Sequence, residues 1–406
     1  MKKTLWNKNF SLLIFASALG TMGGIAGGFA LSFLVFDETG STLASALIVA
    51  IQFVPSIFLP LVIAPWMDRL PRKHVLVAGD AICGVIYGCM GVYLMKFAFS
   101  YTGYLMVSLL LSCLWTVDEL AYSSIYPSLI PKGMEEKGYA VSAMLYPILR
   151  VVIMPLAGIL LDTVGVAMIL LIQGGCSLLA AFVESGIQAP YTPPRERYSL
   201  KGWLEDIREA AAYIRKERGL RSIYGYMAVS NGVAKGYAPI LVAYFRTAPG
   251  MSAALYSLFS VAEFLGRTLG SMVQYRVKIP DKKKFSLAFG IYQFYDWMDM
   301  SLLWLPYPLM LINRGLCGFL GSNSAILRSA AVQRYIPEHL RARVNAFDHM
   351  LFNASCTLFP LLIGALGEVM DYRLCVTVCG VLSLAACWVL IFGRRRDVRA
   401  IYERAD

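Results

Sequence analysis

Acidic and basic side chains interrupt the long apolar stretches of this 406-residue chain. Asp118 and Glu119 lie near the middle of one stretch, and Arg150 lies near the middle of the next. An ionisable group inside a membrane costs about 2.5 to 3.5 kcal/mol, so it persists mainly where it faces a cavity or a partner. We therefore expect one of the two acids to pair with Arg150 and to bind and release protons. Which acid faces the cavity stays open, because adjacent helical residues point about 100° apart.

A second set of ionisable residues follows in the later half of the chain. Lys235 and Glu263 lie about equally far from the same expected membrane face, roughly 15 Å by helix rise, which makes them candidates for a second pair. Arg267 follows Glu263 by four residues and shares its helical face. We expect these three side chains to belong to the same mid-membrane site.

A third set consists of Asp296 and Asp299, which share one helical face, and Arg314, which enters the next apolar stretch at a similar depth. These positions suit an ion pair buried between two helices. We expect this set to be a structural clamp that lies away from any cavity.

Aromatic and amide side chains on the same stretches would suit a cavity for an amphipathic organic solute, although each would also fit a lipid-facing or core position. The candidates are Trp115, Tyr122, Tyr126, Asn231 and Asn323. The three histidines, His74, His339 and His349, lie near one expected face of the membrane. We expect surface or capping roles for these histidines.

The composition indicates a polytopic membrane protein, because only 16% of the residues are charged, 58% are hydrophobic and the mean hydropathy is +0.59. Each apolar run is long enough to cross a hydrocarbon core of about 30 Å as a helix. The expected spans lie at 10–36, 42–66, 75–97, 101–129, 139–162, 165–187, 220–245, 252–276, 283–304, 307–335, 344–368 and 373–393.

The net charge of +11 gives the orientation of these spans. Most basic residues lie at the two ends of the chain and in alternate loops, whereas the opposite loops hold only Lys96, Arg246 and Arg373. This asymmetry follows the positive-inside rule and predicts that both termini are cytoplasmic. It also removes nucleic acid as an expected partner. The first span is too long for a signal peptide and lacks a small-residue cleavage site, so we expect it to stay uncleaved.

A proline-rich stretch and a polar amphipathic segment divide the chain into two halves. The segment places Leu200, Trp203, Leu204 and Ile207 at helical spacing with charges between them. The predicted organisation is a six-helix bundle over residues 1–187, a cytoplasmic linker with an amphipathic helix over 188–219, and a second six-helix bundle with a short basic tail over 220–406. The cysteines lie mostly inside expected helices without CxxC spacing, so we interpret them as core residues and expect no metal site.

The two halves repeat each other at an offset of 206 residues. Ile130-Pro131 recurs as Ile336-Pro337, and Gly158 recurs as Gly364. Parallel repeats related by an axis along the membrane normal are typical of secondary transporters, in which the substrate binds where the halves meet. The repeat therefore favours transport.

The loop after the second span contains Asp68, Arg69, Arg72 and Lys73. It resembles the G-x-x-x-D-R-x-G-R-[RK] loop of the major facilitator superfamily, with Ala64 and Pro71 in place of the two glycines. The resemblance implies an all-α fold of twelve membrane helices in two pseudo-symmetric bundles. It also implies that Asp68, Arg69, Arg72 and Lys73 form a gating loop that governs conformational exchange. In the second copy of the loop, Gln274 replaces the acid.

Two further stretches, residues 126–131 and 155–158, look most like the enterobactin-exporter and macrolide-efflux branch of that superfamily. This resemblance implies export. It also implies that the fourth and fifth spans line the cavity, which is why Asp118, Glu119 and Arg150 are favoured as functional residues.

We expect a proton-coupled exporter of an amphipathic small molecule in the cell (inner or plasma) membrane, acting by alternating access as a monomer. The proton gradient is the expected driving force, and no cofactor is expected. The alternative within transport is an inward symporter or uniporter of a small polar solute. A membrane-embedded enzyme is disfavoured because the sequence has no HExxH or GxSxG motif.

Overall fold

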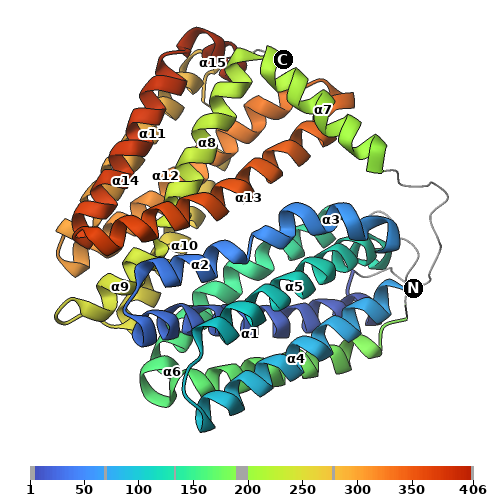
Figure 1. Ribbon diagram of the computed structural model, residues 1–406. Helices are drawn as coiled ribbons and strands as arrows, with labels where there is room; N and C mark the ends of the chain where they lie inside the picture. Colours follow the sequence, from blue (N-terminus) through green and yellow to red (C-terminus); the bar gives the residue numbers. More distant parts are fainter. Residues whose placement is uncertain (1–4, 68–70, 132–133, 189–199, 277–278, 404–406) are drawn as a thin grey trace. The chain divides into compact units, whose positions relative to one another are not determined.

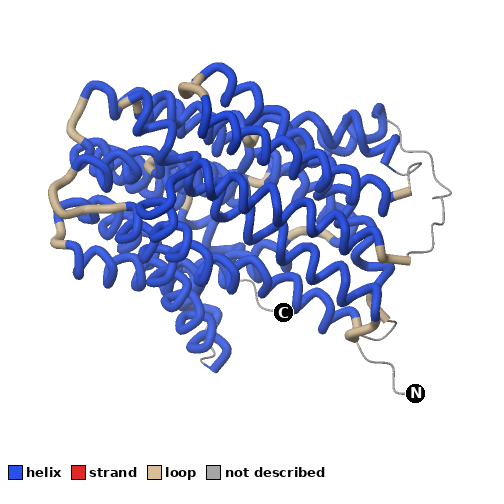
Figure 2. The backbone as a smooth tube through the Cα atoms, turned by 90° about the horizontal axis from the view of Figure 1, so that it is seen from below, coloured by secondary structure: helices blue, strands red, loops and turns tan. Residues whose placement is uncertain are grey.

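The computed structural model describes residues 5–67, 71–131, 134–188, 200–276 and 279–403. Every regular element over these ranges is a helix, and short loops connect most of them (Figure 2). The chain divides into two compact units. Unit 1 comprises Met1–Gly40, Ile51–Leu200 and Gly250–Ser257, and unit 2 comprises Ser41–Ala50, Lys201–Pro249 and Leu258–Asp406.

Unit 1 is built around its longest helix, α6, against which α1 and α4 pack, while α5 packs on α3 and α4. The glycine at position 165 has φ 77°, a left-handed conformation that breaks α6 into the two expected spans 139–162 and 165–187. The helices of this unit are α1 (Lys8–Thr39), α3 (Val54–Met67), α4 (Arg72–Lys96), α5 (Tyr101–Leu129) and α6 (Glu135–Ser185).

Unit 2 pairs α8 with α13 and α11 with α12 and α14 (Figure 1). In chain order, the elements are α2 (Thr42–Ile51), α7 (Leu200–Lys216), α8 (Arg218–Gly236), α9 (Ala238–Thr247), α10 (Ala253–Arg276), α11 (Asp281–Ser301), η1 (Leu302–Trp304), α12 (Tyr307–Tyr335), α13 (Glu338–Val369), α14 (Tyr372–Ala386), η2 (Cys387–Phe392) and α15 (Arg395–Tyr402).

Each of the expected spans corresponds to described helix. Some are interrupted, as where α2 and α3 meet at Gln52 and Phe53 or where α8 and α9 meet at Tyr237. Among the described residues, seven helices are long and apolar enough to cross a membrane: Lys8–Thr39, Thr42–Pro60, Arg72–Lys96, Tyr101–Leu129, Lys137–Ser185, Val344–Val369 and Tyr372–Phe392. The all-α membrane fold is thus confirmed, whereas the count of twelve spans stays a prediction.

The division into 1–187, 188–219 and 220–406 also stays a prediction. The units of the structure exchange two short segments, because Ser41–Ala50 groups with unit 2 and Gly250–Ser257 groups with unit 1. In unit 1, a Cβ at Gly158 would lie 2.9 Å from Ala254 Cα. In unit 2, a Cβ at Gly364 would lie 2.4 Å from Ala46 Cβ. Glycines related by the sequence repeat therefore permit two equivalent close helix contacts.

Two amphipathic segments pack at one end of unit 2. The stretch expected as a linker contains α7, whose Ile214 is buried in the core of this unit. The expected short basic tail contains α15, which packs on α8 (Figure 1). Val398, Ile401 and Tyr402 are buried because their i, i+3, i+4 spacing places them on one helical face.

Candidate functional site

Three acidic side chains gather inside unit 1, and we call them the acid cluster: Asp80 of α4, Asp118 of α5 and Glu184 of α6. Asp80 and Asp118 are the electrostatic neighbours of Glu184, and Asp80 is also a neighbour of Asp118. Glu184 is only 4% exposed. The cluster therefore gathers three carboxyl groups from three helices of unit 1.

Asp118 is directed toward α4, where Gly79 leaves room for it. A Cβ at Gly79 would lie 3.4 Å from Asp118 Oδ1. Among the described residues, neither Asp118 Oδ1 nor Glu184 Oε2 has a hydrogen-bond partner, although both atoms are buried. These two oxygens are therefore available to bind protons.

Over the part of the chain that the structure describes, Asp118 does not pair with Arg150, while the alternative pairing of Glu119 with Arg150 stays a prediction. The charged neighbours of Asp118 are Asp80 and Glu119, both acidic, and Arg150 is not among them. Asp118 lies against Gly79 of α4. Glu119, one position further along α5, is exposed. Asp118 is thus the acid that faces the bundle interior, a choice that the sequence left open.

The aromatic residues of α5 have three different environments. Tyr122 lies beside Ser17 and Ser142 and has Glu184 as an electrostatic neighbour, which places it next to the acid cluster. Its ring packs on Tyr126 at a centroid distance of 5.2 Å. Tyr126 is buried, and its hydroxyl donates a hydrogen bond of 2.5 Å to the Gly138 carbonyl, which fixes the start of α6. Trp115 is 67% exposed.

Unit 2 contains a cavity of about 340 Å³ between α8, α12 and α13, which we call the polar cavity. Its volume is suited to a small organic molecule. Polar and apolar side chains alternate along its wall. The lining residues are Tyr224, Met227, Ala228, Asn231, Arg328, Ser329, Val332, Gln333, Asn345, Asp348, His349, Leu351 and Phe352.

The polar cavity contains one guanidinium and one carboxylate that the sequence analysis missed. Arg328 and Asp348 face it from α12 and α13, and each is an electrostatic neighbour of the other. Both residues interrupt apolar stretches, but they lie toward the ends of the expected spans, where a charge is less costly and less conspicuous. Asn231 lines this cavity, and its role in transport stays a prediction. His349 lines the cavity as well, which its expected surface or capping role did not include.

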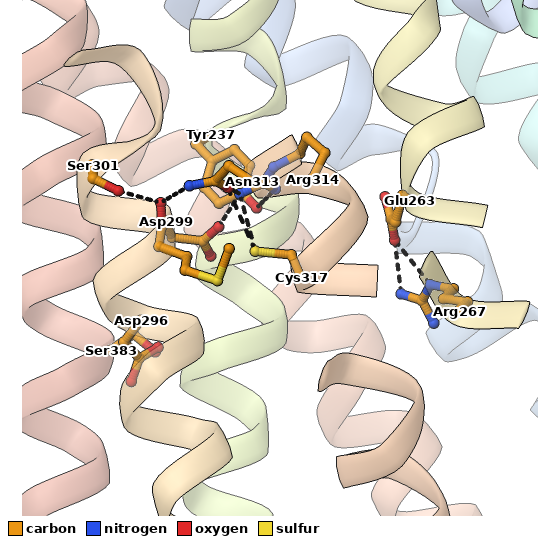
Figure 3. Close-up of polar contacts among 11 residues, drawn as sticks. Tyr237, Glu263, Arg267, Asp296, Asp299, Ser301, Asn313, Arg314, Cys317 and Ser383 are labelled. Atoms are coloured by element: carbon orange, nitrogen blue, oxygen red, sulfur yellow. Dashed lines mark hydrogen bonds and ion pairs between the residues drawn. The ribbon is translucent and has the colours of Figure 1, made fainter. Parts of the chain in front are cut away.

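The other candidate residues of unit 2 do not line the polar cavity. Glu263 pairs with Arg267 at 2.8 Å on α10, as the i, i+4 spacing predicted (Figure 3). Lys235 is exposed near the end of α8, and its pairing with Glu263 stays a prediction. Asn323 donates to the Phe319 carbonyl of its own helix at 2.8 Å and does not line the polar cavity.

The expected clamp is confirmed. Arg314 forms an ion pair with Asp299 in which both side chains are 7% exposed, and it donates a 3.2 Å hydrogen bond to the Tyr237 hydroxyl (Figure 3). Asp296, one turn before Asp299, accepts a 2.8 Å hydrogen bond from Ser383 of α14. These contacts join α11 to α12 and α14, and none of the residues lines the polar cavity.

The expected gating loop lies partly outside the described residues, which exclude Asp68 and Arg69. Arg72 and Lys73 are the first two residues of α4. Their assignment to a gating loop, like that of the remaining site candidates, stays a prediction.

Comparisons with known proteins agree with this architecture. A family profile described as Major Facilitator Superfamily matches residues 10–294 and 285–404. No curated protein matches the chain.

Among solved structures, the chain is similar to the nucleoside transporter NupG, with 14% identity and a TM-score of 0.70 over 94% of this chain and 98% of that one. It is also similar to the POT family transporter PepTSo, with 14% identity and a TM-score of 0.72 over 97% of this chain and 98% of that one. At this level of identity, these similarities establish the fold.

Proposed function

Because the chain belongs to the Major Facilitator Superfamily, and is therefore an integral membrane transporter, we propose that it is a proton-coupled exporter of an amphipathic small molecule. The acid cluster of unit 1 would bind the coupling proton, and the polar cavity of unit 2 would bind the solute. The observation that carries the proposal is the acid cluster.

The cluster supports proton coupling through simple electrostatics. Asp80, Asp118 and Glu184 have acidic neighbours, and two of their buried oxygens lack a hydrogen-bond partner among the described residues. Like-charged carboxylates that are neighbours of one another ionise together only at a cost, so a cluster of this kind is suited to taking up a proton. A buried acid that gains and loses a proton is the usual carrier in such transporters.

The polar cavity supports an organic solute. Its walls combine Arg328, Asp348 and amide groups with apolar side chains such as Met227 and Phe352. Pockets of this kind bind the apolar body of a ligand by burial and orient it through a few polar groups. We accordingly prefer an amphipathic solute to a purely polar one.

The test uses the purified protein in liposomes with a pH-sensitive dye inside and an imposed pH gradient. A panel of aromatic acids, amines and amino acids is added, and solute movement and proton movement are followed together. We expect a solute that moves against its gradient while protons move in the opposite direction. Replacing Asp118 with Asn and Glu184 with Gln should abolish gradient-driven movement, whereas downhill exchange of the solute should persist.

The matched control is Asp281→Asn, which removes an exposed acid that pairs with Lys284 outside both sites. This variant should transport like the parent protein. Full coupling in the variant that lacks both Asp118 and Glu184 carboxylates would contradict the proposal. Co-movement of solute and protons in the same direction would favour the inward symporter.

The remaining parts of the proposal concern gating and location. Asp68, Arg69, Arg72 and Lys73 are proposed to control the rate of conformational exchange, so Asp68→Asn should slow transport more than it weakens solute binding. We also propose a monomer in the inner or plasma membrane with both termini cytoplasmic, on the basis of the basic loops.

A further inference from the structure

The polar cavity of unit 2 presents two opposite charges that do not form an ion pair with each other. Arg328 and Asp348 both line it and are electrostatic neighbours. Over the described residues, however, they do not approach to the 4.0 Å that defines an ion pair. Both side chains are only partly buried. A charge that is not in contact with its opposite partner is available to a ligand.

Arg328 has tyrosine neighbours on two other helices. Tyr292 of α11 and Tyr402 of α15 are both electrostatic neighbours of its guanidinium. The two hydroxyls share a 2.7 Å hydrogen bond, and both tyrosine side chains are buried. A guanidinium has five N–H donors, so contact with the tyrosines leaves several donors for a ligand.

Asp348 lines the cavity from α13. On this helix, Asn345 accepts a 2.8 Å hydrogen bond from Gln333 of α12. This amide pair joins the two helices at the cavity that Arg328 and Asp348 line. His349, the next residue of α13, also lines the cavity.

The space between the charges has apolar sides. Met227, Val332, Leu351 and Phe352 belong to the same lining as Arg328 and Asp348. A solute that fills the cavity would place an apolar body against these side chains and polar groups against the two charges.

We propose that the polar cavity selects a small amphipathic zwitterion, whose anionic group binds Arg328 and whose cationic group binds Asp348. This inference rests on the proposed function and names the chemical class of its solute. An anionic solute would satisfy Arg328 and be repelled by Asp348. A cationic solute would bind Asp348 and be repelled by Arg328. A neutral solute would leave both charges without a partner.

The test measures equilibrium binding to the full-length protein in detergent micelles, without any gradient, by isothermal titration calorimetry. The probes are 4-(aminomethyl)benzoate as the zwitterion, 4-methylbenzoate as the anion and 4-methylbenzylamine as the cation, which share one aromatic body. We expect the zwitterion to bind at least about tenfold more tightly than either singly charged probe. Equal affinity of a singly charged probe, or no binding of the zwitterion, would overturn the proposal.

Two variants remove the two proposed charge contacts with the solute one at a time. In Arg328→Gln, the zwitterion should bind no better than 4-methylbenzylamine, and in Asp348→Asn it should bind no better than 4-methylbenzoate. The variants Arg328→Lys and Asp348→Glu keep each charge and should retain the preference, even if folding is weakened. Arg395→Gln and Asp281→Asn remove exposed charges outside the cavity and should bind like the parent protein.

A uniform loss of affinity for all three probes in Arg328→Gln and Asp348→Asn would assign these residues a structural role and overturn the proposal. Because the measurement needs no proton gradient, it is independent of the acid cluster. Selective zwitterion binding without gradient-driven transport would contradict the proposed function alone. Proton-coupled transport of a singly charged solute through the same cavity would contradict this inference alone.

Discussion

At the scale of single residues, the charged side chains inside this protein divide into those that form an ion pair and those that do not. Arg314 and Asp299 form an ion pair, and the Tyr237 hydroxyl accepts a further hydrogen bond from Arg314. Asp118 instead lies among acids, and Arg328 faces a cavity. An ion pair compensates both of its charges, whereas a group without an opposite charge in contact can bind a proton or a solute.

The ion pair of Arg314 and Asp299 gives a prediction about stability. Arg314→Met should lower the free energy of unfolding by about 3 to 5 kcal/mol, because Asp299 would keep a buried charge without its partner. Adding Asp299→Leu to this variant should recover most of the loss. The measurement is thermal unfolding of the purified variants combined in a double-mutant cycle.

Arg267→Met is the matched control for Arg314→Met, because the Arg267 side chain is 53% exposed and pairs with Glu263 on the same helix. Such an exposed pair contributes only about 0 to 1 kcal/mol. If the losses from Arg314→Met and Asp299→Leu simply added, the pair would not act as one structural unit.

At the scale of elements, α15 links the C-terminus to the polar cavity. The helix is eight residues long, and its apolar face packs on α8 and α12. Tyr402 reaches the Tyr292 hydroxyl, which in turn lies beside Arg328. A short terminal helix would be marginal by itself, so its order depends on this packing.

Tyr402→Phe tests this link, because it removes one hydroxyl and keeps the ring. We expect a loss of about 0.5 to 1.5 kcal/mol in stability, the usual net value of one hydrogen bond. We also expect a weaker affinity for 4-(aminomethyl)benzoate with little change for 4-methylbenzylamine, since only the anionic end meets Arg328. Thermal unfolding and calorimetric titration measure the two effects.

Arg396→Gln, an exposed position on α15, serves as the control and should change neither quantity. Equal weakening for both probes in Tyr402→Phe would show that α15 supports the fold of the cavity as a whole and does not position Arg328 specifically.

At the scale of the whole molecule, the sequence repeat recurs as a pair of equivalent helix contacts. In unit 2, the start of α2 packs on α13 at Gly364, and the Glu368 carboxylate accepts a 2.8 Å hydrogen bond from the Leu43 backbone N–H. In unit 1, the start of α10 packs on α6 at Gly158. Each unit therefore contains a segment from the opposite half of the sequence.

Replacing either repeat-related glycine with leucine should damage the protein to a similar extent. The new side chain at Gly158 or Gly364 would overlap backbone atoms of the neighbouring helix, and overpacking of this kind costs about 1 to 3 kcal/mol. We expect each variant to lower the melting temperature of the purified protein and to reduce transport.

Gly175→Leu is the control, because a Cβ at this position of α6 meets no atom within 4 Å. It should leave the melting temperature nearly unchanged. A marked effect at only one of the two repeat-related glycines would mean that the repeat in sequence does not carry an equivalent role in the structure.

Features that depend on neighbouring residues were predictable from the sequence alone. Apolar runs placed the helices, because a helix in a membrane satisfies its own backbone hydrogen bonds whatever surrounds it. The spacing of Glu263 and Arg267 was sufficient for their ion pair, since residues four apart share a helical face. The pair of Asp299 and Arg314 followed from equal depth on consecutive helices.

Features that depend on how each helix is rotated against its neighbours were decided by the tertiary structure. Asp118 meets Asp80 and Glu184 and not Arg150, because α5 turns it toward the space above Gly79. Arg328 and Asp348 become one site only because α12 and α13 bring them to the same cavity. A rotation of one residue, about 100°, would separate these groups without altering the apolar pattern that places the helices.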